Sequence, residues 1–231
     1  MVALAVPRGR VGVMDESSFL AALPVERRLA LAYAPARSRL LWLGLFALDA
    51  RLGAVVQTAH EPLLAQIKLA WWRDELAKAA AARALGEPLL ALLGSWADQS
   101  AALGALVDGW EVLLGDEPLD EAAMQQVAEA RAQACAGLAA RLDLSAAEPE
   151  ARRAARGWAL AELGAALTDP DQQAAALNLI ARQDWYRARL PRELRPLQVL
   201  HGLAARQRGH GSFISGPAAA LRAVRLGLLG I

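Results

Sequence analysis

The hydrophobic and polar positions of this chain fall into helix-length segments that prolines separate. Proline is tolerated in the first turn of a helix and breaks the interior of one. Each proline therefore indicates a helix start or a connection. The pattern predicts helices at residues 15–23, 25–34, 36–56, 61–84, 88–102, 103–114, 119–141, 148–167, 170–189, 192–207 and 218–229.

The segment 37–56 is apolar nearly all round, which is typical of a helix buried at the centre of a bundle. Its most apolar stretch, Leu40–Leu48, has nine residues, whereas a membrane-spanning helix needs about 20. Alanines alternate with polar residues between Leu119 and Leu142, and such small side chains would let neighbouring helices approach closely. We expect a bundle with 37–56 at its centre.

The next predicted helix carries Leu64, Ile67 and Trp71 three or four positions apart, and we expect this stripe to be buried. Asp74 and Lys78 lie four residues apart and are expected to pair on its surface.

Composition indicates the fold class. Of the 231 residues, 55% are hydrophobic and 21% are charged, which is typical of a globular protein. Strands need β-branched residues, and here these are scarce, with 12 Val, 4 Ile and 2 Thr. We therefore predict an all-α protein, with a flexible N-terminus at 1–14 and one helical domain at 15–231.

Cys135 is the only cysteine, so neither an internal disulfide nor a Cys-based zinc site is expected. A reducing compartment is the natural default for such a chain. Residues Met1–Val13 lack the basic start and apolar run of a signal peptide. We expect a cytoplasmic protein, with peripheral contact to the inner membrane left open.

Charge is unevenly distributed. The net charge of +1 divides into 13 basic and 19 acidic residues at 1–150, and 12 basic and 5 acidic residues at 151–231. This Arg-rich C-terminal third is a solvated basic face, or it binds a diphosphate, an anionic membrane surface or an acidic partner. No recognition motif supports nucleic acid. The last segment, 218–231, docks on the bundle or touches a membrane.

Local catalytic motifs are absent. The three histidines show no metal-ligand spacing, and no motif of a nucleophile elbow or a phosphate-binding loop occurs. We therefore expect no cofactor.

Paired acids remain, because two carboxylates four residues apart on a helix can bind Mg²⁺ together. The run 116–121 offers two such pairs, but a glycine and a proline flank or interrupt it, and we interpret it as a turn and a helix start. Asp169 and Asp171 are expected at an N-cap and first turn. Asp108 and Glu111 face either a cavity or solvent.

Three segments carry a more specific pattern. The first, at 31–76, ends in Trp71-Trp72-Arg73-Asp74-Glu75-Leu76. The second is Val107-Asp108-Gly109-Trp110-Glu111, and the third is Arg189-Leu190-Pro191-Arg192-Glu193-Leu194. Together they resemble the squalene/phytoene synthase family over residues 20–200, and the Trp-Trp-Arg segment is the most specific of them.

This resemblance implies an isoprenoid-synthase fold, with helices around a central cavity. Active members hold Mg²⁺ between two facing Asp-rich motifs and so bind prenyl diphosphates. The metal neutralises the leaving diphosphate, and an apolar pocket shelters the carbocation.

Both Asp-rich motifs are degenerate in this chain. The first falls on Gly53 and Gln57, and the second on Asn178 and Arg182. Placing the second on Asp169 instead leaves a glutamine as its partner. We therefore expect no catalytic residue and no metal ligand.

The residues that remain as candidates for cavity or ligand contact come from the resembling segments and the Arg cluster. They are Trp71, Trp72, Arg73, Asp108, Glu111 and Arg187. Trp71 and Trp72 point about 100° apart on a helix, so one is expected in the core while the other lines a groove or meets a partner.

The missing carboxylates favour a binding or assembly protein without prenyl-diphosphate condensing activity. Such a protein would be similar to the members of a divergent branch of the family, which includes an assembly factor for respiratory complex I. One alternative is a prenyltransferase that condenses prenyl diphosphates head to head at a rearranged Mg²⁺ site. The other is an isoprenoid- or lipid-binding module. At least three carboxylates converging on one cavity would favour the enzyme. An exposed apolar or basic patch would favour the assembly protein, and a large closed apolar cavity without acids would favour the carrier.

Overall fold

The computed structural model describes residues 16–59, 61–115, 118–186, 188–208, 216–228 and 230, without the side chains at 97 and 216–221. Its α-helices are α1 Glu16–Ala22, α2 Val25–Leu31, α3 Ala36–Gln57, α4 Pro62–Ala77, α5 Pro88–Leu92, α6 Ser100–Val112, α7 Glu121–Arg141, α8 Glu148–Ala166, α9 Pro170–Ala181, α10 Arg195–Gln207 and α11 Gly216–Leu228. Short 3₁₀ turns lie at Ala80–Ala82, Leu93–Gln99, Ser145–Ala147 and Arg192–Leu194. No strand occurs among these residues, so the predicted all-α class is confirmed.

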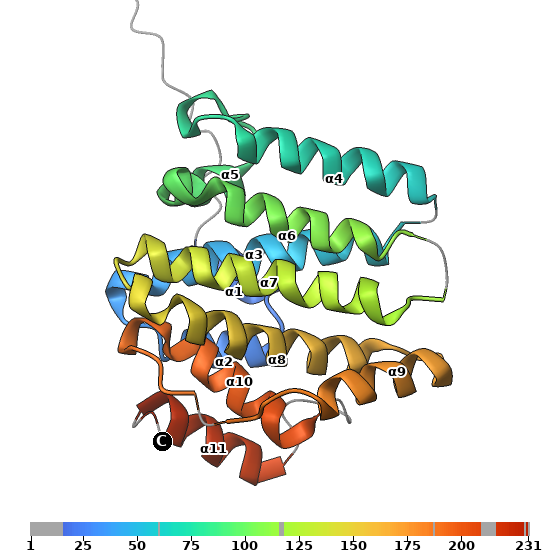
Figure 1. Ribbon diagram of the computed structural model, residues 1–231. Coiled ribbons are helices and arrows are strands. Elements are labelled where there is room, and N and C mark those ends of the chain that lie inside the picture. Colours follow the sequence, from blue (N-terminus) through green and yellow to red (C-terminus); the bar gives the residue numbers. More distant parts are fainter. Residues whose placement is uncertain are drawn as a thin grey trace, which may run out of the picture.

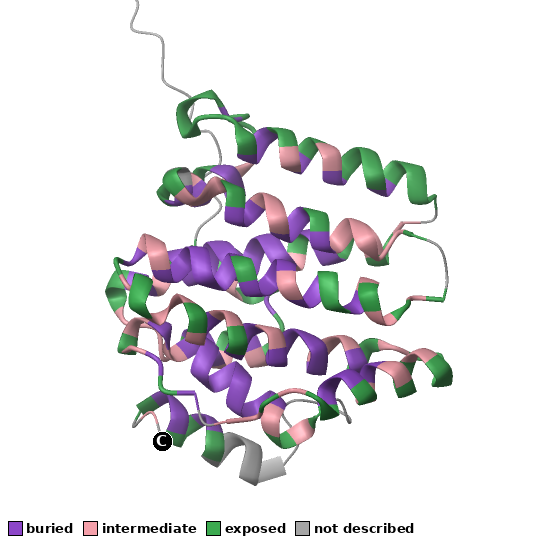
Figure 2. Ribbon diagram, viewed as in Figure 1, coloured by how far each residue is buried: buried purple, intermediate pink, exposed green. Residues whose placement is uncertain are grey.

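The helices form a stack in which α4, α6, α7, α8, α10 and α11 follow one another from one end to the other (Figure 1). The helix α3 packs behind α6 and α7, and its residues Leu41–Asp49 are all buried (Figure 2). By length and composition α3 could cross a membrane, but most of it is buried in the bundle. Its predicted place at the centre of the bundle is confirmed.

Small residues hold the middle helices close together, as the sequence predicted. A Cβ added to Gly109 on α6 would lie 2.4 Å from the Cβ of Ala130 on α7. A Cβ added to Gly137 on α7 would lie 2.5 Å from that of Ala102 on α6. Two carbon atoms cannot approach so closely, so larger residues at either glycine would force α6 and α7 apart.

Helix starts follow the sequence signals. Proline occupies the first turn of α4, α5, α8, α9 and α10. The Asp120 carboxylate accepts a hydrogen bond from the Ala123 amide at 2.7 Å, and Asp169 accepts from the amides of Asp171 and Gln172. The predicted helix start near residue 120 and the predicted N-cap at Asp169 are therefore confirmed.

Three predicted helices have the wrong extent. The helix at 61–84 ends at Ala77, because the buried Arg83 donates hydrogen bonds to carbonyls of Leu76, Lys78 and Leu93 and so holds a chain reversal. The helix predicted at 88–102 ends at Leu92, a 3₁₀ turn follows at Leu93–Gln99, and α6 begins at Ser100.

The third of these helices, predicted at 170–189, ends at Ala181. The indole of Trp185 donates to the Ile180 carbonyl at 2.8 Å and satisfies one of the carbonyls that a helix end leaves free. Residues 182–186 after α9 are therefore not helical.

The burial expected for α4 is also wrong. Leu64, Ile67 and Trp71 are 52%, 57% and 39% exposed, while Leu69 and Trp72 on the opposite side are 0% and 4% exposed. Both sides of α4 carry apolar residues, so the sequence pattern did not fix which one faces α3 and α6. Likewise Lys78 pairs with Glu75 rather than with Asp74.

Candidate functional site

The predicted candidates on α4 and α6 meet at the surface. The Arg73 guanidinium donates to Asp108 Oδ1 at 2.7 Å and to a Glu111 carboxylate oxygen, and this ion triplet links α4 to α6. The Asp108 side chain is 62% exposed and that of Glu111 is 36% exposed. Neither acid lines the cleft described below, so the solvent-facing interpretation of this pair holds.

The two adjacent tryptophans divide as predicted. Trp72 is buried, and Trp71 is exposed with its ring edge-on to Trp72 at a centroid distance of 5.1 Å. Arg187 lies outside the described residues.

The positions of the two degenerate motifs are not brought together. Gly53 and Gln57 on α3 line one cleft, whereas Arg182 at the end of α9 lines a second pocket between α7, α8 and α9. There Arg182 forms an ion pair with Glu121 of α7 at 2.5 Å, and Asn178 is exposed. The facing arrangement that the resemblance implies does not form between these four positions.

The cleft beside Gly53 has a volume of about 590 Å³, which is in the range of small-molecule sites. It lies between the C-terminal halves of α3, α6 and α8, the N-terminal half of α7 and the connection from α1 to α2. Its apolar lining residues are Ala22, Pro24, Ala50, Ala54, Val56, Leu113, Val127, Leu163, Ala166 and Leu167.

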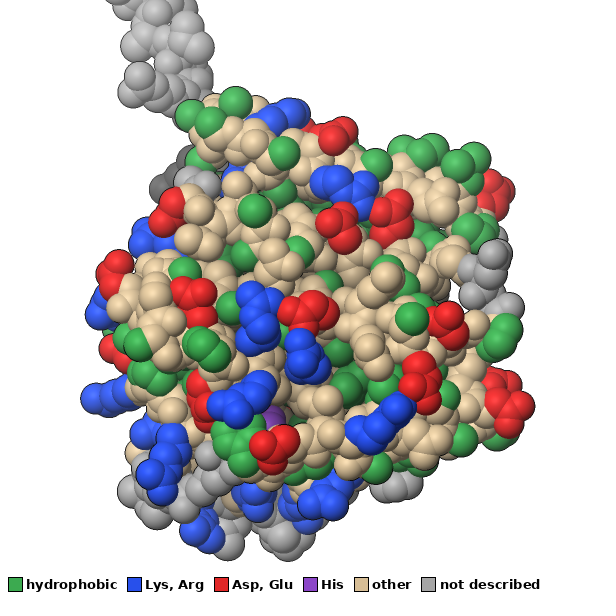
Figure 3. Space-filling view, viewed as in Figure 1, with side chains coloured by type: hydrophobic (Ala, Val, Ile, Leu, Met, Phe, Trp, Pro, Cys, Tyr) green, Lys and Arg blue, Asp and Glu red, His purple; other side chains and the backbone are tan. Residues whose placement is uncertain are grey.

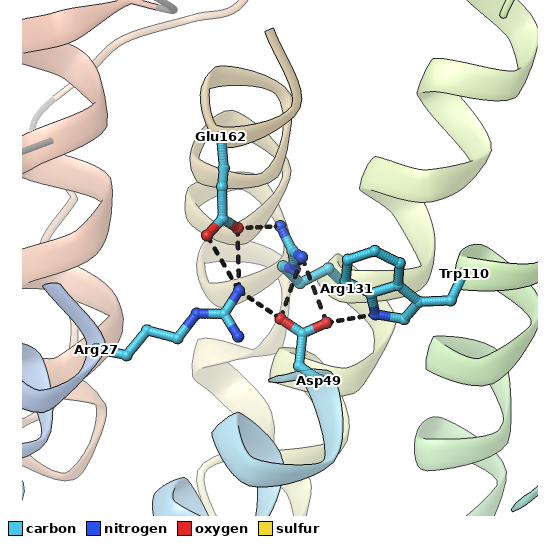
Figure 4. A network of polar contacts seen from close by, with 5 residues as sticks. All are labelled: Arg27, Asp49, Trp110, Arg131 and Glu162. Atoms are coloured by element: carbon cyan, nitrogen blue, oxygen red, sulfur yellow. Dashed lines mark hydrogen bonds and ion pairs between the residues drawn. The ribbon is translucent and has the colours of Figure 1, made fainter. Parts of the chain in front are cut away.

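Four charged side chains from four helices form the polar end of this cleft (Figure 4). Arg27 Nη2 lies 2.6 Å from Asp49 Oδ2 and 3.0 Å from Glu162 Oε1. Arg131 Nη2 lies 3.1 Å from Asp49 Oδ2, and its Nη1 lies 2.6 Å from Glu162 Oε2. We call this group the charged quartet, and its formal charges sum to zero.

The charged quartet is well buried and is held from two further sides. Arg27, Asp49 and Arg131 are each less than a tenth exposed. The Trp110 indole donates to Asp49 Oδ1 at 2.7 Å, and both guanidinium groups lie over the ring of Trp158. Such cation–π contacts add to the ion pairs in a site from which water is largely excluded.

Electrostatic interactions favour the charged forms of Asp49 and Arg27. Burial alone would raise the pKa of Asp49, but the Arg131 and Arg27 guanidinium groups outweigh burial and hold that pKa below its ordinary value. Burial opposes the charge of Arg27 as well, yet Asp49 and Glu162 raise its pKa above the ordinary value. Each carboxylate is therefore already neutralised by two cations.

The cleft does not fit the Mg²⁺ that the resemblance implies. Glycine at 53 offers no side-chain ligand and Gln57 only a neutral amide, whereas Mg²⁺ is bound through carboxylates and substrate phosphates. Two guanidinium groups at the same end would repel the ion. Within the described part of the chain, no three His, Cys, Asp or Glu side chains gather as a metal site would require.

Sequence reasoning missed the charged quartet as a whole. These residues come from segments separated by up to 135 positions, and no local motif joins them. One signal was present, because Asp49 directly follows the apolar run Leu40–Leu48 on a buried helix and therefore requires a buried partner.

Comparison of the chain with known protein families, with curated proteins and with solved structures gave no match.

Proposed function

We propose that this protein is a non-catalytic, squalene/phytoene-synthase-like binding protein whose cleft takes an amphipathic molecule of isoprenoid or lipid type. The charged quartet carries this proposal. An apolar cleft closed at one end by buried polar groups suits a ligand with an apolar body and one polar end.

Charge balance narrows the class of ligand. A diphosphate brings several negative charges next to Asp49 and Glu162, and no metal site among the described residues offsets them. A neutral alcohol or ester avoids this repulsion. Its oxygen can accept from the guanidinium groups of Arg27 and Arg131, which line the cleft.

The direct test compares farnesol with farnesyl diphosphate by isothermal titration calorimetry. We expect farnesol to bind more tightly and Mg²⁺ to have no effect on either ligand. Ala54→Trp fills the cleft from an exposed position on α3 and is expected to abolish binding. Ala77→Trp, at the exposed end of α4, adds the same side chain elsewhere and is expected to leave binding unchanged.

Turnover is measured on the same protein, with labelled farnesyl diphosphate and Mg²⁺ or Mn²⁺. Metal-dependent release of diphosphate that Ala54→Trp abolishes would establish the prenyltransferase alternative and refute the proposal. Failure of both ligands to bind folded protein would also refute it.

A second observation favours an assembly role beside ligand binding. The exposed residues Leu63, Leu64, Ile67 and Trp71 form a continuous apolar strip along the outer side of α4, which we call the α4 strip. Hydrophobic side chains gather over this end of the molecule in Figure 3. Exposed apolar patches of this kind commonly mark contact surfaces. An assembly role predicts that Ile67→Glu disrupts a complex without unfolding the protein, which co-purification from the native host can measure.

A further inference from the structure

The C-terminal end of the molecule carries cations without matching anions. From residue 188 onward the chain has seven arginines and one acidic residue, Glu193. No carboxylate within 4 Å pairs with Arg192, Arg195, Arg208, Arg222 or Arg225 in the described part of the chain. Basic side chains gather along this lower edge in Figure 3. We call these five residues the basic face.

The basic face includes only some of the arginines in the Arg-rich third of the sequence. Arg152 and Arg156 both pair with Glu129, and Arg153 pairs with Glu150. These arginines, like Arg182, serve contacts between helices or within one helix. An external anion can instead pair with the five arginines of the basic face.

Arginine side chains repel one another at this C-terminal end of the molecule. The pKa of Arg222 lies below its ordinary value, through partial burial first and then through the neighbouring charges of Arg206 and Arg225. An anion placed among these side chains relieves that repulsion.

A pocket of about 260 Å³ opens within the basic face. Arg192 and Arg195 line it together with Tyr33 and Leu228. Arg195 is oriented by a hydrogen bond from its Nη1 to Gln198 Oε1 at 2.6 Å. Two guanidinium groups at one small pocket provide the fork-shaped donors that phosphate oxygens accept.

Exposed apolar side chains lie beside this pocket. Leu228 and Val224 on α11 are 69% and 40% exposed and lie one turn apart. Arg225 is also exposed on the same helix, while Ala223 and Leu226 face the bundle. Apolar and basic residues side by side on an exposed helix face are typical of helices that lie in a membrane interface.

We propose that this end of the molecule docks on an anionic membrane surface. A lipid phosphate occupies the pocket between Arg192 and Arg195, and Leu228 and Val224 enter the acyl boundary next to it. An oligonucleotide or an acidic peptide would match the charge but would leave the exposed leucine in water. The inference does not rest on the cleft, which lies elsewhere on the molecule.

The position of the basic face also separates it from the α4 strip. The two lie at opposite ends of the helix stack, with α6, α7 and α8 between them (Figure 1). One flat surface cannot contact both. Docking through α11 therefore leaves the α4 strip pointing away from the membrane.

The experiment is co-sedimentation of the full chain with vesicles of phosphatidylcholine alone or with phosphatidylglycerol added. We expect binding only to the anionic vesicles and weaker binding as salt increases. Arg192→Gln or Arg225→Gln should each weaken binding about fivefold at low ionic strength. Lys68→Gln removes an exposed charge from α4 at the other end and should change nothing.

Leu228→Ser separates the apolar contribution from the charges. It should weaken vesicle binding while leaving the salt dependence unchanged, because it removes apolar area that the membrane would bury and removes no charge. Circular dichroism confirms that each variant is folded.

Several results would overturn the inference. These are equal binding to neutral vesicles, no binding to either, or the same loss from Lys68→Gln as from Arg225→Gln. Inorganic phosphate that displaces the protein from vesicles at micromolar concentration would indicate a soluble-anion site instead. Tight binding of an oligonucleotide with no vesicle binding would indicate nucleic acid.

Discussion

Replacing Asp49 tests whether the charged quartet holds the fold together. The Asp49→Asn side chain has nearly the same shape, and its amide oxygen can still accept from the Trp110 indole. It removes the negative charge that faces Arg27 and Arg131 at 2.6 Å and 3.1 Å. Two buried guanidinium groups are then left with the single carboxylate of Glu162.

The expected loss is large because these ion pairs are buried. Breaking a buried ion pair by removing one partner costs about 3–5 kcal/mol, since the remaining charge stays buried and unbalanced. A domain of this kind is stable by only about 5–15 kcal/mol, so Asp49→Asn should remove a third or more of the free energy of unfolding.

Asp108→Asn provides the matched control. It makes the same chemical change in an ion pair with Arg73, but the Asp108 side chain is 62% exposed. Exposed pairs contribute about 0–1 kcal/mol. Urea unfolding of the wild-type protein and both variants, followed by tryptophan fluorescence, measures the difference. A loss for Asp49→Asn within about 1 kcal/mol of that for Asp108→Asn would refute the reasoning.

The pH dependence provides a second readout of the same group. The pKa of Asp49 is lower in the folded state than the value of about 3.9 for an unfolded chain. As pH falls below about 4, the unfolded state therefore binds protons first and stability decreases. Asp49→Asn should lack this part of the acid sensitivity.

Two further predictions concern α4 and His201. Ile67→Ala should change the free energy of unfolding by less than about 0.5 kcal/mol, because Ile67 is 57% exposed. Leu69→Ala should lower it by about 2–5 kcal/mol. If urea unfolding gave the opposite order, α4 would pack by its other side. Burial holds the pKa of His201 below its ordinary value, although the carbonyls of Tyr186 and Ala154 and the charge of Glu150 partly offset burial. The unfolded chain then takes up a proton first below about pH 6.5, so stability should fall as pH decreases from there, and His201→Gln should flatten that fall in urea titrations at several pH values.

The fold class was predictable because it depends on composition and proline spacing, and both can be taken directly from the sequence. Few β-branched residues and a proline in the first turn of several helices suffice to exclude strands and to place most helix starts. Helix ends were harder. Alanines continue from Ala77 past the end of α4, and only the long-range hydrogen bonds of the buried Arg83 turn the chain there.

The side of α4 that is buried could not be predicted, because the helix has apolar residues on two sides. Periodicity identifies a buried side only when the opposite side is polar. Here the sequence supports either orientation, and the fit of Leu69 and Trp72 against α3 and α6 decides. Because the side with Leu69 and Trp72 packs against the bundle, the second apolar side of the helix, the α4 strip, stays exposed.

The charged quartet shows why a site built from separated segments escapes motif searches, and its geometry supports the proposed binding role. Asp49 and Glu162 lie on α3 and α8, and the residues one turn further along these helices are Gly53 and Ala166, which both line the cleft. A Cβ at Gly53 would lie only 2.9 Å from the Trp110 ring, so an aspartate there would collide with the residue that holds Asp49. The Trp110 ring thus leaves no room for a carboxylate at position 53, and the two arginines neutralise the carboxylate of Asp49. Restoring one carboxylate would therefore not recreate a metal site, because the two guanidinium groups would remain. This arrangement accords with the neutral ligand that we propose for the cleft.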